Sequence, residues 1–309
     1  MMTTTAARPA ASARPRRRVN TPYLLIVPSA VILLIAMGYP LAWQLVTSLQ
    51  RFGLAQQFGQ AAPFVGLDNY VRLASDPYLW TVIVRSLIFC FVAAAATIII
   101  GVLVALLMRV VPTAVRILLQ ISLLLAWAMP VVAAMTVWNW LFDWRRGVVN
   151  WLLSAIGLPF ENHNWLQDPV SFFAVAAIIV VWMSVPFVAF SLYAALTQVS
   201  GEVLEAAQMD GAHGSQRFFL IIVPIIRPVL AIVLLLQVIW DLRVFTQIKL
   251  LQDAGSIASE TNLLGTYIYQ LGTGSSDFGT ASAVSIFVLM LTITISAFYV
   301  RSMLKEDES

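Results

Sequence analysis

Six long blocks of apolar residues constrain the fold of this chain more than any other feature. They cover approximately residues 23–47, 83–107, 115–141, 172–196, 229–250 and 281–300. A helix of about 18 or more apolar residues is long enough to cross a hydrocarbon core of about 30 Å. Only 11% of the residues are charged, against about 25% in a typical soluble domain. We therefore predict an all-α integral membrane protein with six transmembrane helices.

The distribution of lysine and arginine predicts the orientation of the chain in the membrane, because cytoplasmic loops are enriched in both residues. With the N-terminus inside, most of them face the cytoplasm: Arg8, Arg14, Arg16, Arg17, Arg18, Arg109, Arg116, Arg217, Arg227, Arg301 and Lys305. The opposite side receives only Arg51, Arg72, Arg85, Arg145 and Arg146. Both termini are therefore predicted to be cytoplasmic.

The predicted transmembrane domain covers residues 21–301, between a basic disordered tail at 1–20 and a short cytoplasmic tail at 302–309. The first apolar block is longer than the ~7–15-residue core of a signal peptide, and no A-x-A-like cleavage site follows it. We expect that span to be retained.

The sequence lacks the motifs of ATP hydrolysis and of common hydrolytic catalysis. A P-loop needs a glycine-rich loop that ends in Lys followed by Ser or Thr, and neither Lys249 nor Lys305 follows a glycine. The two histidines, His163 and His213, are predicted on opposite sides of the membrane, so a zinc site or a Ser–His–Asp triad lacks its components. We predict that the chain is not an enzyme and has no catalytic residue, metal, cofactor or nucleic acid of its own.

A polar, glycine-broken segment follows the fourth apolar block, in the stretch LEAAQMDGAHGSQRFFLIIVP over 204–224. Ser200 suits a helix N-cap, and Glu202 in the first turn complements the helix dipole. The helix is predicted to run over about 201–210 and to end at Gly211, which tolerates a left-handed turn. Ser215 is predicted to cap a second helix that leads into the fifth span.

A helix of about ten residues is marginal by itself in water, so this one needs something to pack against. Ala206 and Ala207 leave a nearly bare backbone on one flank, and Glu205 and Asp210 offer charged acceptors around it. From the residues alone, two interpretations stay open. The segment is either a coupling element for a cytoplasmic partner or an ordinary amphipathic connector.

The same segment resembles the EAA loop of ABC importer permeases. That pattern is EAA, three residues, Gly, nine residues, Ile, one residue, Leu, Pro, and only Val223 departs from it, in the leucine place. The longer form EAA-x-x-DGA is similar to the carbohydrate-uptake, maltose-type branch. Further similar stretches, in the same order as in that branch, are PSAVILLIAMGYPLAWQLVTSLQRF, FVGLDNYVRLASDPYLW, VVNWLLSAIGLP and NWLQDP.

The resemblance implies an ABC type I importer fold in the cell membrane and a role in binding-protein-dependent sugar import. It implies that the loop over about 200–224 carries a coupling helix that docks on a cytoplasmic ATPase. The coupling residues carried over are Glu205, Ala206, Ala207, Asp210 and Gly211. The implied partners are a second permease, two ATPase subunits that use ATP and Mg²⁺, and an external solute-binding protein.

Charged residues inside the fifth apolar block are candidates for the substrate path, because charge within a span is expensive and usually functional. Asp241 shares a helical face with Gln237, and Arg243 shares one with Gln247. Sugars are bound by such polar groups together with aromatic rings. The candidate path residues are Gln237, Trp240, Asp241, Arg243, Phe245 and Gln247. The alternative is that Asp241 and Arg243 form structural ion pairs with other helices.

Some positions depart from the family pattern and leave the substrate open. Thr246 stands where members often carry Asp, LQDAG over 251–255 replaces a TGGP-like end, and QVS over 198–200 replaces SIP. Glycerol phosphate or a polyol is the alternative substrate. Alternatives of other classes are a stand-alone secondary carrier, for which the expected internal repeat is not seen, and a membrane enzyme.

Overall fold

The computed structural model describes the backbone of residues 21–307 and the side chains of residues 25–301. The basic tail predicted over 1–20 lies outside the described residues. The described chain falls into two compact units, one ending at Val46 and the other beginning at Thr47. The helices in chain order are α1 (Thr21–Ser48), α2 (Leu54–Gln57), α3 (Asp68–Ala74), α4 (Pro77–Val110), α5 (Thr113–Ala128), α6 (Val131–Leu141), α7 (Val148–Ala155), α8 (Pro169–Leu196), α9 (Gly201–Met209), α10 (Gly214–Arg217), η1 (Phe218–Ile222), α11 (Val223–Leu242), α12 (Thr246–Asp253), α13 (Ala258–Thr261), α14 (Leu264–Tyr269), η2 (Gln270–Gly274) and α15 (Phe278–Asp307).

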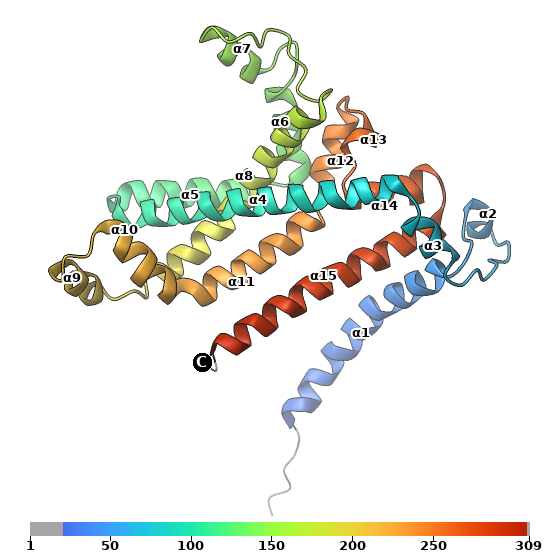
Figure 1. The fold of residues 1–309 in the computed structure, drawn as a ribbon, viewed down its shortest axis with the longest axis horizontal. Helices are drawn as coiled ribbons and strands as arrows, with labels where there is room; N and C mark the ends of the chain where they lie inside the picture. The colour runs from blue at the N-terminus through green and yellow to red at the C-terminus, as the bar shows by residue number, and fades with distance from the viewer. Residues whose placement is uncertain (1–20, 308–309) are drawn as a thin grey trace, which may run out of the picture. The chain divides into compact units, whose positions relative to one another are not determined.

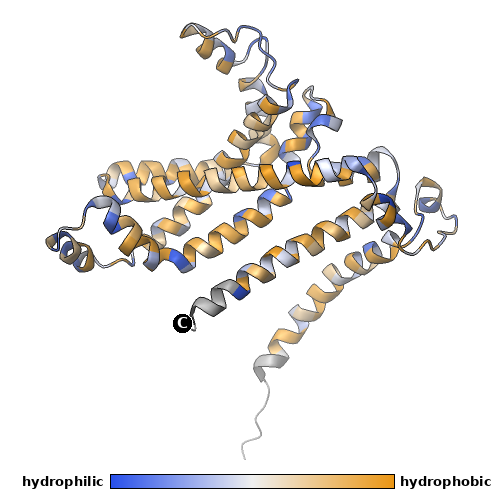
Figure 2. Ribbon diagram, in the orientation of Figure 1, coloured by the Kyte–Doolittle hydropathy of each residue, from blue (hydrophilic) through white to orange (hydrophobic). Residues whose placement is uncertain are grey.

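Five of the helical segments are long and apolar enough to cross a membrane, and the bent pair α5 and α6 raises the number to six if it is one span. Figure 2 shows apolar residues along the length of these helices and hydrophilic residues at the turns between them. The predicted blocks 23–47, 83–107, 172–196 and 281–300 lie within α1, α4, α8 and α15. The residues predicted as a C-terminal tail continue α15 as helix as far as Asp307.

The third predicted span, over 115–141, is not one straight helix. It consists of α5 and α6, which meet at an angle of 102°. Met129 ends α5 with an extended backbone, at φ −69° and ψ 128°, and Pro130 precedes α6. Proline has no N–H to donate and disfavours a helical conformation in the residue before it. The residues of the predicted span are therefore helical on both sides of a bend that the prediction did not include.

The fifth predicted span, over 229–250, is also interrupted. Helix α11 ends at Leu242, and α12 begins only at Thr246. No proline or glycine lies at this break. Gly265 of α14 packs against it so closely that a Cβ on Gly265 would lie 3.0 Å from the carbonyl oxygen of Val244. Tertiary packing therefore accompanies this break, where the local sequence contains no helix breaker.

Small residues bring α4 and α8 together at the centre of the larger unit. Ala93 and Ala105 of α4 and Ala189 of α8 are fully buried. A Cβ on Gly101 would lie only 2.4 Å from Cγ1 of Val188. Small residues allow transmembrane helices to approach closely and to gain packing energy where the hydrophobic effect supplies little.

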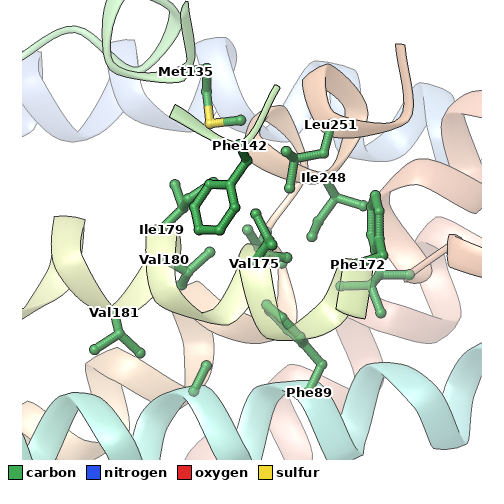
Figure 3. Close-up of a cluster of buried hydrophobic side chains, with 14 of the residues drawn as sticks. Phe89, Met135, Phe142, Phe172, Val175, Ile179, Val180, Val181, Ile248 and Leu251 are labelled. Atoms are coloured by element: carbon green, nitrogen blue, oxygen red, sulfur yellow. The ribbon is translucent and has the colours of Figure 1, made fainter. Parts of the chain in front are cut away.

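The largest buried cluster extends this packing toward α6 and α12. Figure 3 shows Phe89 of α4 facing the side chains of α8, with Phe142 and Met135 on the opposite side of α8. Ile248 and Leu251 of α12 complete the cluster. The segment that follows the break at Arg243 is thus held in the protein interior by its own apolar face.

Candidate coupling helix and substrate path

Helix α9 ends through a backbone motif centred on Gly211. The Gly211 φ angle is +84°, a value that glycine adopts without strain. The N–H of Ala212 donates to the carbonyl of Ala207 at 2.9 Å, and that of Gly211 donates to the carbonyl of Gln208 at 3.1 Å. These two bonds form a Schellman motif, which satisfies carbonyl groups left free at the end of a helix. The predicted helix end at Gly211 is therefore present.

Helix α9 starts at the predicted position, but the predicted capping hydrogen bond is not made. Ser200 occupies the N-cap, yet its side chain makes no capping hydrogen bond. The predicted cap of the next helix was wrong, because α10 starts at Gly214 and not after Ser215. The His213 N–H donates instead to Oε1 of Gln216 at 2.8 Å. The sequence reasoning considered only serine as a cap and missed the glutamine that satisfies the N–H of His213.

One side of α9 is attached to the bundle. Leu204 packs against a buried cluster formed by residues of α4, α8, η1, α11 and the turn before α9, among them Leu196, Val199 and Ile222. Arg217 of α10 donates from Nη1 to Oε1 of Gln208 at 3.1 Å. In Figure 1, α9 and α10 lie together beside the start of α11. Sequence reasoning missed Leu204 as the anchor, although it is an apolar residue beside the polar motif.

The other side of α9 presents the predicted coupling residues to the surroundings. Glu205, Ala206, Asp210 and Gly211 are exposed, and Ala207 is half-buried. Met209 has 87% of its surface exposed. Leu204 and the hydrogen bond from Arg217 thus hold α9, while most of its motif residues stay exposed.

The six residues predicted for the path divide by burial. Gln237 and Asp241 are buried, Phe245 and Gln247 are half-buried, and Trp240 and Arg243 are exposed. The predicted face shared by Gln237 and Asp241 is present, since Nε2 of Gln237 donates to Oδ1 of Asp241 at 2.8 Å. The face predicted for Arg243 and Gln247 is not, because the helix breaks between them. Gln247 donates instead toward Sδ of Met183 at 3.6 Å.

Asp241 lies inside the chain, next to α4. Cys90 of α4 donates to the carbonyl of Val238 at 3.4 Å, which fixes this part of α11. Oδ2 of Asp241 and Oε1 of Gln237 are buried and have no hydrogen-bond partner. No cation within the described residues forms an ion pair with Asp241, so the structural ion pair considered for it is not seen.

Two exposed residues, Trp240 and Arg243, lie near the same helix end. The Trp240 ring centroid lies 5.0 Å from that of Phe187, with the planes at 61°. Arg243 follows three residues later at the C-cap of α11, where its backbone leaves the helix at φ −105°. The Phe245 ring packs beside that of Tyr269 at 5.4 Å. An aromatic ring and a guanidinium group are thus both exposed near the end of α11.

The sequence matches the family model of the binding-protein-dependent transport system inner membrane component over residues 97–304. The chain belongs to this family. It is 37% identical over 299 residues to the diacetylchitobiose uptake system permease protein DasB of Streptomyces coelicolor, in a match that covers 96% of this chain and 91% of that protein. It is 34% identical over 283 residues to the trehalose/maltose transport system permease protein MalF of Thermococcus litoralis, with 90% and 92% covered.

A solved structure has the same fold. The bacterial alginate ABC transporter, in complex with an alginate pentasaccharide-bound periplasmic protein, contains a chain that matches with a TM-score of 0.76 at 24% identity, covering 90% of this chain and 92% of that one. The predicted family, the all-α importer permease fold and the location in the inner membrane are confirmed. The orientation of the termini and the roles of individual residues stay predictions.

Proposed function

We propose that this chain is one permease subunit of an ATP-driven importer for a sugar, either a di- or oligosaccharide or an amino sugar. It pairs with a second, homologous permease and binds two copies of a cytoplasmic ATPase subunit. A solute-binding protein outside the membrane delivers the substrate. ATP and Mg²⁺ are used by the ATPase, because this chain has no P-loop of its own.

The observation that carries the coupling role is the construction of α9. Its end is fixed by the Schellman bonds at Gly211, and its face with Glu205 and Ala206 is exposed. Leu204 joins it to the cluster that contains η1 and α11. A force applied to α9 is therefore transmitted to the helix that carries Asp241 and Arg243. An ordinary connector needs neither the exposed motif nor this attachment.

The sugar assignment is supported by the relatives and by the open end of α11. DasB and MalF are named as permeases for diacetylchitobiose and for trehalose and maltose. Trp240 and Arg243, both exposed near the end of α11, offer an aromatic ring and a hydrogen-bond donor. Selection among sugars belongs mainly to the separate binding protein.

Site-directed crosslinking tests this proposal. Cys90 is the only cysteine of the chain and has 1% of its surface exposed, so a thiol introduced by Met209→Cys is the accessible one. We expect it to crosslink to the ATPase subunit and the yield to change when ATP is bound. Ile156→Cys, at a residue of the 142–168 segment that is 73% exposed, is the matched control and should not crosslink. No ATPase adduct at position 209, or uptake driven by an ion gradient without ATP, contradicts the proposal.

A further inference from the structure

A polar pocket lies in the segment between α6 and α8, away from both α9 and the end of α11. It has a volume of about 400 Å³, within the range of about 300–1,000 Å³ typical of small-molecule sites. Figure 1 shows α7, which supplies one wall, standing apart from α4 and α8. The sequence predicts this segment on the external side of the membrane. The residues that matter here are Trp144, Arg146, Trp151, Ser154, Glu161 and Asn162.

Two sets of hydrogen bonds, made by the side chains of Asn150 and Asp143, hold the residues around the pocket in place. Asn150 is 5% exposed, and its Nδ2 donates to the carbonyl of Trp144 at 3.2 Å and to that of His163 at 2.8 Å. The Trp165 Nε1–H donates to the Asn150 side chain. The carboxylate of Asp143 accepts from the backbone N–H groups of Arg145 and Arg146 at 3.0 and 2.7 Å. The Asn150 side chain therefore joins the two walls through part-buried hydrogen bonds, which preorganises the pocket.

The turn at the base of the pocket admits only glycine at one position. A Cβ on Gly147 would lie 2.3 Å from the carbonyl oxygen of Asp143. The N–H of Gly147 donates to that same oxygen at 2.8 Å. On the facing wall, Asn162 has φ +57°, a left-handed conformation that asparagine tolerates better than most residues. Both walls are shaped by unusual backbone.

Several polar groups of the pocket, unlike Asn150, are not used by the fold. Oγ of Ser154 is buried and has no hydrogen-bond partner. Arg146, Glu161 and Asn162 are exposed, and no side chain in the described part of the chain forms a hydrogen bond or ion pair with theirs. Trp151 exposes 68% of its surface. The Arg145 guanidinium carbon lies 4.2 Å from the Trp144 ring centroid, which keeps this second tryptophan in place.

We propose that this pocket is a second saccharide site, outside the translocation path, which receives a sugar ring against Trp151. Arg146 donates to ring substituents, Glu161 accepts from them, and Asn162 does both. Sugar hydroxyls suit such a mixture because each one donates and accepts. An acidic peptide segment of a partner protein suits it less, because its carboxylates meet Glu161. The choice of a saccharide as the ligand rests on the proposed function. The existence of the pocket does not depend on that function.

The test uses the full chain, purified with the subunits that accompany it, in lipid nanodiscs without binding protein. Tryptophan is replaced by 5-fluorotryptophan, and Trp151→Phe assigns the ¹⁹F resonance of Trp151. The probes are N,N′-diacetylchitobiose, maltose, trehalose and alginate pentasaccharide. We expect at least one to shift the Trp151 resonance saturably. Glu161→Gln and Arg146→Gln should each raise its Kd at least about tenfold, because each removes a hydrogen bond to a charged group.

The matched control is Glu260→Gln, an exposed glutamate of α13 far along the chain from the pocket, which should leave the Kd unchanged. No shift with any of the four saccharides, or a Kd that neither pocket variant changes, overturns the inference. Loss of binding-protein affinity in the pocket variants, with the saccharide titration unchanged, identifies the pocket as a protein contact and also overturns it. Failure of the proposed importer function appears separately, in the crosslinks from position 209 and in ATP-dependent uptake.

Discussion

Helices α9 and α11 end in two different ways, and the difference explains which parts of this protein were predictable. Helix α9 ends at a glycine with φ +84°, whose backbone bonds are local. Helix α11 ends at Leu242 without a glycine or proline, at a place where Gly265 packs against the carbonyl of Val244. The first end is a property of a few adjacent residues. The second depends on a segment about twenty residues farther along the chain.

The largest expected effect comes from removing the local end of α9. Gly211→Pro forces φ to about −65° and removes the N–H that donates to Gln208, at about 3 kcal/mol or more. We expect ATP-driven uptake to fall by about two orders of magnitude, with the amount of protein in the membrane unchanged. Uptake into cells or proteoliposomes measures it.

Gly214→Ala is the control for that substitution. A Cβ on Gly214 would meet no atom within 4 Å, and its φ is not left-handed, so uptake should stay near that of the unchanged chain. Normal uptake by the Gly211→Pro protein would show that the end of α9 has no part in coupling.

The tertiary end of α11 should respond to a change in α14. Gly265→Val places a branched side chain where a Cβ already lies 3.0 Å from the Val244 carbonyl and 3.4 Å from Cβ of Phe245. Overpacking of this kind destabilises by about 1–3 kcal/mol. We expect a lower thermal midpoint in detergent. Gly272→Ala, where the nearest atom is at an ordinary 3.5 Å, is the control, and equal midpoints for both variants would refute the packing account.

The exposed face at the end of α11 should affect substrate affinity more than rate. Arg243→Gln removes a charged donor that is exposed beside Trp240, a change worth about 1 kcal/mol. We expect KM for uptake, at saturating binding protein, to rise about fivefold with little change in maximal rate. Arg116→Gln, near the start of α5, is the comparison. An unchanged KM would remove Arg243 from the path.

The smallest effect is expected at the buried face of the same helix. Asp241→Asn keeps a side-chain oxygen at the position of Oδ1, which accepts a hydrogen bond of 2.8 Å from Nε2 of Gln237 in the unchanged chain. Across the described chain no cation pairs with this carboxylate, so loss of its charge should leave uptake within about twofold. A tenfold loss would show that the charge itself acts in transport and that the contrast with Arg243 is false.

The prediction of the long helices from the sequence succeeded because membrane spans leave a strong signal. Apolar blocks must be long and nearly free of charge, and α4 and α8 contain the predicted blocks entirely. The predicted blocks did not include the bend at Pro130 or the helix break at Arg243, where no local signal exists. The coupling helix was predictable to within a residue, because its end is a glycine and its start follows a serine.

The sequence by itself determined the membrane class, the family, and the exposed helix that ends at Gly211, since each depends on residues close together in the chain. Only the tertiary structure decided that Leu204 anchors this helix, that α11 stops at Leu242, and that Asp241 turns inward while Arg243 stays exposed. These features depend on which distant helices meet. Hydropathy along a single helix carries no record of its neighbours, so packing between helices had to be seen.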